Sequence, residues 1–303
     1  MATASDNLRR ARPLLGTFVE IEVAGAANAE MNAAINAAFE AVASVHRLMS
    51  FHEPDSDVSR LNREACVRPV GVHAWTYQVL EAAVEMHRRS NGIFDIAVAP
   101  TLQAMGLLPR LGNDVPVEAE ARPLDAIELL EGRTVRFRQA NVMIDLGGIA
   151  KGFAVDRALE VLRGSGAAGG LVNAGGDLAA FGGAPQTVHV RHPRDPGRLI
   201  CSVEVTDEAL ASTARRFDPF QSADTASSAI IDPGSRKPAD AIDGVTVRAP
   251  SCMMADALTK IVMIAGTEAT ELLDHHNASA LLISPDGNVQ ISPDWHHAVH
   301  LAA

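Results

Sequence analysis

Two glycine-rich runs carry the residues best suited to hold a phosphate-containing ligand. The first run is Asp145-Leu-Gly-Gly-Ile-Ala-Lys-Gly152, whose glycines let the backbone approach a ligand closely. A turn that opens a helix presents N–H groups and the positive end of the helix dipole, which suits a phosphate, and Lys151 adds a mobile charge. The spacing fits an ordinary tight turn about equally well. It does not meet the GxxxxGK[ST] pattern of a P-loop.

The second run is Asn173-Ala-Gly-Gly-Asp177. Its glycines also allow close approach, and the Asp177 carboxylate could accept a hydrogen bond from a ribose or a ring N–H. A bulged turn with a local Asx hydrogen bond is the alternative. A third pattern, Gly164-x-Gly166-x-x-Gly169, follows a predicted helix and leads into a predicted strand. This order is the reverse of the Rossmann fingerprint, so we interpret the third pattern as a connecting loop.

Asp256 is a carboxylate inside the apolar helical run 254–264. Its burial costs free energy unless it is paired or bound to a metal. Lys260 lies one turn later on the same helical face, so an Asp256–Lys260 salt bridge is one interpretation. The other is a hard divalent cation such as Mg²⁺, which would bridge the carboxylate and phosphate oxygens.

The elements that must position these residues alternate irregularly along the chain. Apolar periodicity predicts strands at 15–24 and 245–249, β-rich segments over 187–206 and a hairpin over 281–291, with helices at 28–49, 73–90, 153–163 and 254–264. Helices and strands do not alternate strictly. This pattern favours an α+β fold with a largely antiparallel sheet over a doubly wound parallel sheet.

Composition excludes several function classes. The chain has 303 residues, of which 47% are hydrophobic, and a formal net charge of −11, so we expect no nucleic-acid partner. The three cysteines show no CxxC spacing, which argues against a structural zinc site. No apolar run is long enough for a membrane span, and no signal peptide or lipobox is visible. We therefore expect a cytoplasmic protein, or an exported one if a leader has been removed from the sequence.

Taken together, several segments resemble the ApbE family, the FAD:protein FMN transferases, from roughly Arg12 to Asp286. The segment that includes the first glycine run and the one around the second are the most diagnostic for the family. The segments follow the family order and are Pro13–Ile21, Met49–Asn62, Gly92–Pro100, Ile144–Asp156, Val172–Asp177, Ile230–Pro233 and Val247–Leu258.

The resemblance implies an ApbE-type fold, in which residues 1–303 form a single domain of two intertwined, T-fold-like halves with FAD between them. It implies Mg²⁺ held by the Asp256 carboxylate and the Ala150 main-chain carbonyl. It also implies Mg²⁺-dependent transfer of FMN from FAD to a Ser or Thr hydroxyl of an acceptor flavoprotein, such as a respiratory or redox subunit, with release of AMP. We assign Asp256 and Lys260 as catalytic candidates, and as cofactor-binding candidates His52, Asp95, Gly147, Gly148, Ala150, Lys151, Gly175, Gly176, Asp177 and Asp232.

Three departures from the family pattern leave other functions open. Ala229 stands where the family usually has a histidine, and Lys260 stands where it usually has a metal-binding threonine. Arg215 and Arg216 replace a Ser-Gly-x-Tyr pattern and could supply charge for a phosphate. The alternatives to transfer are therefore an FAD-binding protein that stores or delivers flavin, and an Mg²⁺-dependent FAD pyrophosphatase that uses water as the acceptor.

Overall fold

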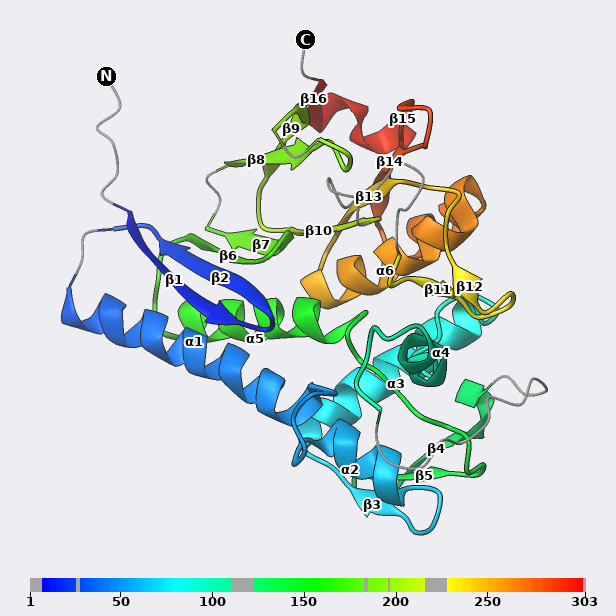
Figure 1. Cartoon of the computed structure of the whole chain (residues 1–303). Helices are drawn as coiled ribbons and strands as arrows, with labels where there is room; N and C mark the ends of the chain where they lie inside the picture. The colour runs from blue at the N-terminus through cyan, green and yellow to red at the C-terminus, as the bar shows by residue number, and fades with distance from the viewer. Residues whose placement is uncertain are drawn as a thin grey trace, which may run out of the picture.

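The largest element of the fold is an eight-stranded sheet in which every pair of neighbouring strands runs antiparallel (Figure 1). The computed structural model describes residues 7–25, 28–110, 123–182, 185–195, 197–215 and 228–301. In spatial order the strands are β1 (Leu8–Leu14), β2 (Thr17–Val23), β6 (Gly170–Ala174), β7 (Asp177–Phe181), β10 (Ala209–Ala214), β13 (Gly244–Ala249), β14 (Ser279–Ile283) and β15 (Val289–Ile291).

Three long helices cover one face of this sheet: α1 (Ala29–Met49), α5 (Ala150–Gly164) and α6 (Cys252–Ala265). α1 packs against α5, and α5 packs in turn against α6 (Figure 1). α1 begins at Asn28, whose side chain accepts a hydrogen bond from the Met31 N–H at 2.7 Å. The buried side chains of α1 recur at helical spacing, which is how the amphipathic pattern in the sequence becomes a packed face.

A small second sheet covers part of the other face. Its strands are β16 (Val299–Leu301), β9 (Leu199–Val205) and β8 (Gln186–Arg191), with the 3₁₀ segment η3 (Pro293–Ala298) beside them. Strand β7 shows how one strand serves both faces. Leu178 belongs to the apolar cluster under the small sheet, together with the fully buried Trp295, whereas Ala179 belongs to the main core under the helices. Successive strand residues point to opposite faces of the sheet, so β7 packs against the helices on one face and against the small sheet on the other.

The remaining elements lie for the most part below and to the right of the main sheet in Figure 1. They are α2 (Asp57–Glu64), α3 (Ala74–Arg89), α4 (Ala99–Ala104), α7 (Thr270–His275), the 3₁₀ segments η1 (Pro123–Ala126) and η2 (Gly266–Ala269), the sheet β3 (Val70–Gly71), β5 (Thr134–Phe137) and β4 (Ile127–Leu130), and the hairpin β11 (Ile231–Asp232) with β12 (Lys237–Pro238). Asn62 of α2 exchanges hydrogen bonds of 2.8 and 2.9 Å with the backbone of Ile144. This amide fixes the backbone that leads into the first glycine run.

The structure confirms the predicted α+β class and its antiparallel sheet. It also confirms the helix over 28–49 with its Asn28 cap, and the hairpin over 281–291. The strand predicted over 15–24 is β2, but its partner β1 was not predicted. The two strands are joined through Leu15 and Gly16, which have φ of 56° and 71°. Most side chains of β1 are exposed, so its sequence carries no apolar alternation.

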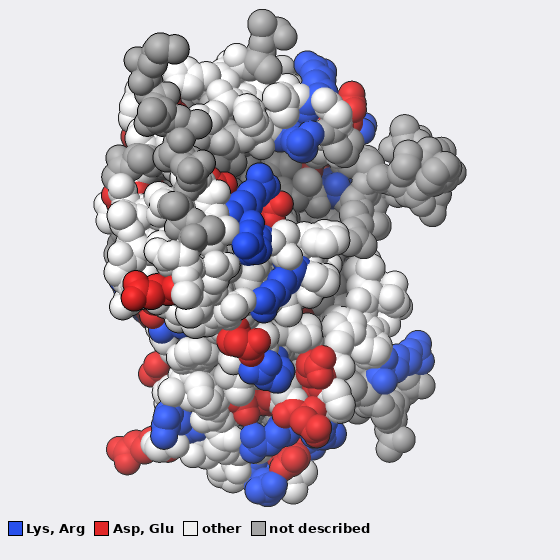
Figure 2. All heavy atoms as spheres, turned by 90° about the vertical axis from the view of Figure 1, so that its left-hand side faces the viewer, with Lys and Arg blue, Asp and Glu red and all other residues white. Residues whose placement is uncertain are grey.

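The surface carries charges of both signs. On the face shown in Figure 2, basic side chains are interspersed with acidic ones and form no continuous basic surface. The exposed basic strand β1 also has an acidic neighbour, because Arg9 forms an ion pair with Glu20 of β2 at 2.7 Å. Over the residues described, none of the helices has both the length and the apolar character required to cross a membrane.

Gly152 provides a test of how tightly the helical layer is packed. A Cβ at this position would lie 2.2 Å from the Cys252 carbonyl oxygen and 2.8 Å from Cβ of Asp256. We expect Gly152→Ala to reduce the free energy of unfolding by about 1–3 kcal/mol, because α5 and α6 must separate to admit the methyl group. Urea denaturation followed by circular dichroism measures the change.

Gly164→Ala is the matched control. Gly164 ends the same helix, and a Cβ there would meet no atom within 4 Å. Since alanine favours a helix over glycine, this variant should be at least as stable as the parent chain. Equal stability of the two variants would show that the crossing at Gly152 is looser than the structure indicates.

Candidate functional site

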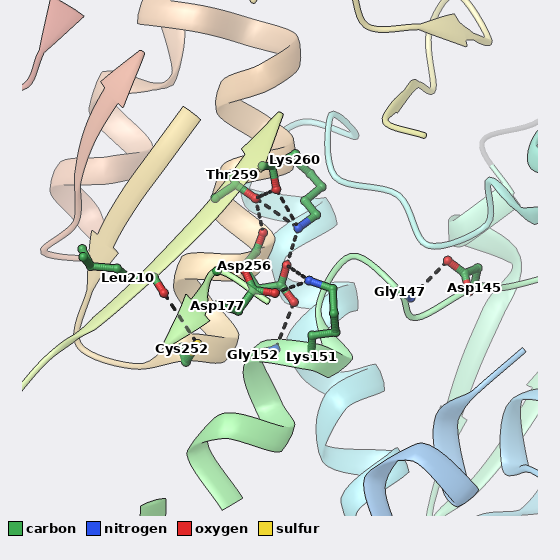
Figure 3. Close-up of polar contacts among 12 residues, drawn as sticks. Asp145, Gly147, Lys151, Gly152, Asp177, Leu210, Cys252, Asp256, Thr259 and Lys260 are labelled. Atoms are coloured by element: carbon green, nitrogen blue, oxygen red, sulfur yellow. Dashed lines mark hydrogen bonds and ion pairs between the residues drawn. The ribbon is translucent and has the colours of Figure 1, made fainter. Parts of the chain in front are cut away.

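Four charged side chains form a cluster where α5, β7 and α6 meet (Figure 3). Lys151 lies in the first turn of α5, Asp177 begins β7, and Asp256 and Lys260 lie on successive turns of α6. Both carboxylates are fully buried. Lys260 pairs with Asp256, and Lys151 pairs with Asp177 and lies 3.9 Å from Oδ1 of Asp256. Two positive and two negative groups balance, which is the condition for burying such charges.

Asp256 is held from a second helix as well. Its Oδ2 accepts a hydrogen bond of 3.0 Å from the Gly152 N–H, so the carboxylate lies at the N-terminus of α5. The helix dipole favours a negative charge at this point. We expected this N-terminus to present its N–H groups to a ligand phosphate. In the structure, the Gly152 N–H instead binds a carboxylate of the chain itself, because α6 crosses directly over the start of α5.

The ammonium group of Lys260 is surrounded by oxygen atoms. Besides Asp256, it donates to Oγ1 of Thr259 at 3.1 Å and to Oγ1 of Thr213 on β10 at 3.3 Å. An ammonium has three N–H donors, and these three oxygens satisfy them. The stem of Lys260 passes over the first glycine run, since a Cβ on Gly148 would lie 3.6 Å from its Cε. The Asp256–Lys260 salt bridge, one of our two interpretations, is therefore present.

Burial and the two lysines shift the ionisation of the cluster in opposite directions. Burial alone would raise the pKa of Asp256, but the charges of Lys151 and Lys260 outweigh it and hold the pKa below its usual value. The pKa of Asp177 is raised by burial and by the negative charge of Asp256. Burial would lower the pKa of Lys151, yet the two carboxylates raise it overall. Lys151 and Asp256 therefore stay charged at neutral pH.

Asp156 joins the two helices that carry the cluster. Its carboxylate, on α5, accepts hydrogen bonds from the N–H groups of Cys252 at 2.8 Å and Met253 at 2.9 Å, and so caps α6. Burial raises the pKa of Asp156 to about 6. Through this contact the position of Lys151 is fixed relative to Asp256. The sequence alone does not predict this role for Asp156, because its partners lie 96 and 97 residues further along the chain.

A cavity of about 220 Å³ lies beside the cluster and combines apolar walls with polar groups. Four predicted site residues line it, namely Asp95, Gly147, Gly148 and Lys260. Asp145, which was not predicted, lines it too and accepts from the Gly147 N–H at 3.1 Å. Burial raises the pKa of both Asp95 and Asp145. Pockets for drug-sized ligands span roughly 300–1,000 Å³, so this cavity would take only part of a dinucleotide.

Four other predicted residues, Gly175, Gly176, His52 and Asp232, are not among those that line this cavity. Gly175 and Gly176 form the β6–β7 turn with φ of 67° and 103°, which glycine adopts readily, and line a different cavity of about 480 Å³. His52 is exposed. It lies near enough to Asp145 for its charge to oppose the rise in the pKa of Asp145 that burial causes. Asp232 accepts from Gly234 N–H at 2.9 Å and so stabilises the turn between β11 and β12. Their roles toward a flavin remain predictions.

Three further residues bear on the departures noted in the sequence. Ala150 begins α5 and is buried, and its N–H donates to the Leu146 carbonyl at 2.8 Å. Ala229 lines the 220 Å³ cavity. Arg215 pairs with Asp243 at 3.2 Å, so its charge has a protein partner, whereas Arg216 lies outside the described residues. Within the described parts of the chain, no three His, Cys, Asp or Glu side chains come together as metal ligands would.

Comparison with known proteins gives one consistent result. The family model described as the ApbE family matches residues 15–282. An FAD:protein FMN transferase of Vibrio cholerae is 30% identical over 236 residues, which cover 74% of this chain and 71% of that protein. One of Treponema pallidum is 30% identical and covers 93% of this chain and 86% of its own length.

Solved structures agree with the fold. The flavin transferase ApbE from Vibrio cholerae superposes with a TM-score of 0.82 at 24% identity, over 97% of this chain and 99% of that one. The ApbE protein from Thermotoga maritima gives a TM-score of 0.82 at 26% identity, over 96% and 99% of the two chains.

The pairing of Lys151 with Asp177 can be tested by a double substitution. Lys151→Met leaves Asp177 buried without its partner, and we expect a loss of about 3 kcal/mol in the free energy of unfolding. Adding Asp177→Asn removes the stranded charge and should recover part of this loss. Urea unfolding at neutral pH measures all three proteins.

Lys237→Met serves as the control, because Lys237 is an exposed lysine on β12. Surface substitutions of this kind change stability by no more than about 0.5 kcal/mol. The pairing would be unimportant if Lys151→Met unfolded like Lys237→Met, or if the double variant were no more stable than Lys151→Met alone.

Proposed function

Because the chain belongs to the ApbE family, we propose that it is an FAD:protein FMN transferase, which moves FMN from FAD to a hydroxyl group of an acceptor flavoprotein and releases AMP. The observation that carries this proposal is the placement of Lys260. Lys260 belongs to the buried charge cluster through its ammonium, and it also lines the cavity formed with Gly147 and Gly148.

The reaction needs positive charge near the pyrophosphate of FAD. The acceptor oxygen forms a bond to the phosphorus of the FMN moiety, the bond from that phosphorus to the bridging oxygen breaks, and AMP leaves with the electron pair. Positive charge stabilises the oxygens that gain negative charge in this step. Among the described residues, Lys260 and the partly exposed Lys151 supply positive charge at the first glycine run.

The acceptor hydroxyl must also lose its proton. Ala229 cannot accept it, since a methyl group has no basic atom. The candidates are the two carboxylates that line the cavity, Asp95 and Asp145. Burial raises the pKa of both, and a carboxylate with a raised pKa is a stronger general base at neutral pH.

The Mg²⁺ implied by the resemblance does not fit the donors as they are arranged. One oxygen of Asp256 is paired with Lys260, and the other accepts from the Gly152 N–H. A divalent ion would also have to lie beside two ammonium groups, those of Lys151 and Lys260. Magnesium dependence therefore remains a prediction of the resemblance, and no step of the proposed reaction passes through a metal.

The second candidate function is an FAD-binding protein that performs no transfer, which Ala229 favours. The third is hydrolysis of FAD, in which water replaces the acceptor hydroxyl. The three functions share a binding site and differ in what becomes of the pyrophosphate bond, so one experiment separates them.

We expect incubation with FAD and the flavin-accepting domain of a respiratory flavoprotein to add the mass of one FMN to the acceptor and to release AMP. Intact-protein mass spectrometry and chromatography of the nucleotides measure both products. An acceptor with its Ser or Thr replaced by Ala should stay unmodified. FAD that binds and stays intact would contradict transfer and support a flavin store. Release of AMP and free FMN without an acceptor would support the pyrophosphatase.

A further inference from the structure

Lysine is rare in this chain and concentrated at the site. The sequence has three lysines among its 26 basic residues, and two of them, Lys151 and Lys260, converge on Asp256. The third, Lys237, is exposed on β12. A lysine ammonium is a compact point charge, whereas an arginine guanidinium is a planar fork. The chain thus places two of its three lysines beside one buried carboxylate.

The surroundings of Lys260 are those of a hard cation. Its ammonium donates hydrogen bonds to one carboxylate oxygen and two hydroxyl oxygens, those of Asp256, Thr259 and Thr213. The two hydroxyls are 2.8 Å apart, and the Thr259 hydroxyl also bonds the Asp256 carbonyl at 2.7 Å, so the oxygens are held in place. Carboxylate and hydroxyl oxygens are the ligand types that Mg²⁺ and Ca²⁺ take in proteins.

The Lys260 side chain also borders the cavity in which a ligand would bind. The stem of Lys260 passes over Gly148, and the residue lines the cavity with Asp95 and Asp145 (Figure 3 shows Lys260 above Asp256). The side chain of Lys260 is 12% exposed, so the charge is largely shielded from water. Shielded charges interact more strongly with a bound anion than exposed ones do.

We propose that the Lys260 ammonium is the permanent cation of this site and takes the place of a divalent metal ion, so that the chain binds the pyrophosphate of FAD without a metal. The identity of this ligand rests on the proposed function. The position of the ammonium among three oxygens is independent of that function. A metal at Asp256 would have to displace Lys260 from Oδ1, and this would leave both lysines beside a divalent charge.

Lys260→Thr tests whether the ammonium takes the place of a metal ion. This substitution removes one positive charge and adds a hydroxyl, so the cluster becomes net negative and gains an oxygen donor. We expect the variant to bind one Mn²⁺ per chain, measured as loss of the free Mn²⁺ signal in electron paramagnetic resonance, with Mn²⁺ alone as the probe. The parent chain and the control Lys237→Thr should bind none at this site.

Two results would overturn the inference in this experiment. One is stoichiometric Mn²⁺ binding by the parent chain that is lost in Asp256→Asn. The other is a folded Lys260→Thr variant, with the circular dichroism spectrum of the parent, that still binds no Mn²⁺. Neither result depends on FAD or on activity.

A second measurement needs no variant and decides the question even if Lys260→Thr does not fold. The affinity of the parent chain for FAD, followed by quenching of flavin fluorescence, should agree within about twofold between EDTA and excess Mg²⁺. A tenfold or greater increase with Mg²⁺ would overturn the inference while leaving the proposed function intact. Absence of FAD binding in both conditions would overturn the proposed function instead, and the Mn²⁺ experiment would still test Lys260.

Discussion

The fold around the site depends on the burial of one carboxylate, that of Asp256. A carboxylate removed from water costs far more free energy than a typical hydrogen bond returns, so it must be compensated on every side. Three groups from two helices do this: the ammonium of Lys260, the more distant ammonium of Lys151 and the Gly152 N–H. Lys260 lies on the same helix as Asp256, whereas Lys151 and Gly152 reach it only because α5 and α6 lie in contact at one point.

That contact sets requirements on residues that touch no ligand. Gly152 must lack a side chain, because the backbone of Cys252 occupies the space a Cβ would need. Asp156 then bonds the start of α6 and keeps the helices in register. The sheet supplies the remaining partners, since β7 carries Asp177 and β10 carries Thr213. The helices and the sheet, which pack together by burying apolar side chains, thus also position the charged groups.

The charge balance has a chemical consequence. The chain has a net charge of −11, so its overall field repels an anionic ligand and a local cation is needed to bind one. Within the cluster, each lysine charge is matched by a carboxylate, yet the carboxylates are fully buried while Lys151 and Lys260 retain some exposure. The lysines are therefore closer to solvent than the carboxylates are, and Lys260 also lines the cavity.

Local sequence determined the features that depend on local spacing. The i,i+4 spacing of Asp256 and Lys260 predicted their salt bridge, because residues one helical turn apart are neighbours whatever the rest of the fold does. The Asn28 cap and the 281–291 hairpin were predicted for the same reason. The two glycine runs were identified as turns from their composition, and the α+β class from the irregular order of the elements.

Only the tertiary structure decided which of these local features meet. Lys151 bonds Asp177 across 26 residues, and Gly152 bonds Asp256 across 104. Such contacts are set by strand order and helix crossing, which no short-range pattern encodes. The glycine run alone predicted that N–H groups at the start of α5 would bind a phosphate. Because α6 crosses the start of α5, the Gly152 N–H binds the Asp256 carboxylate. The sequence identified the charged groups and the pair within α6. The packing of α5 and of the sheet against α6 decided the long-range pairs.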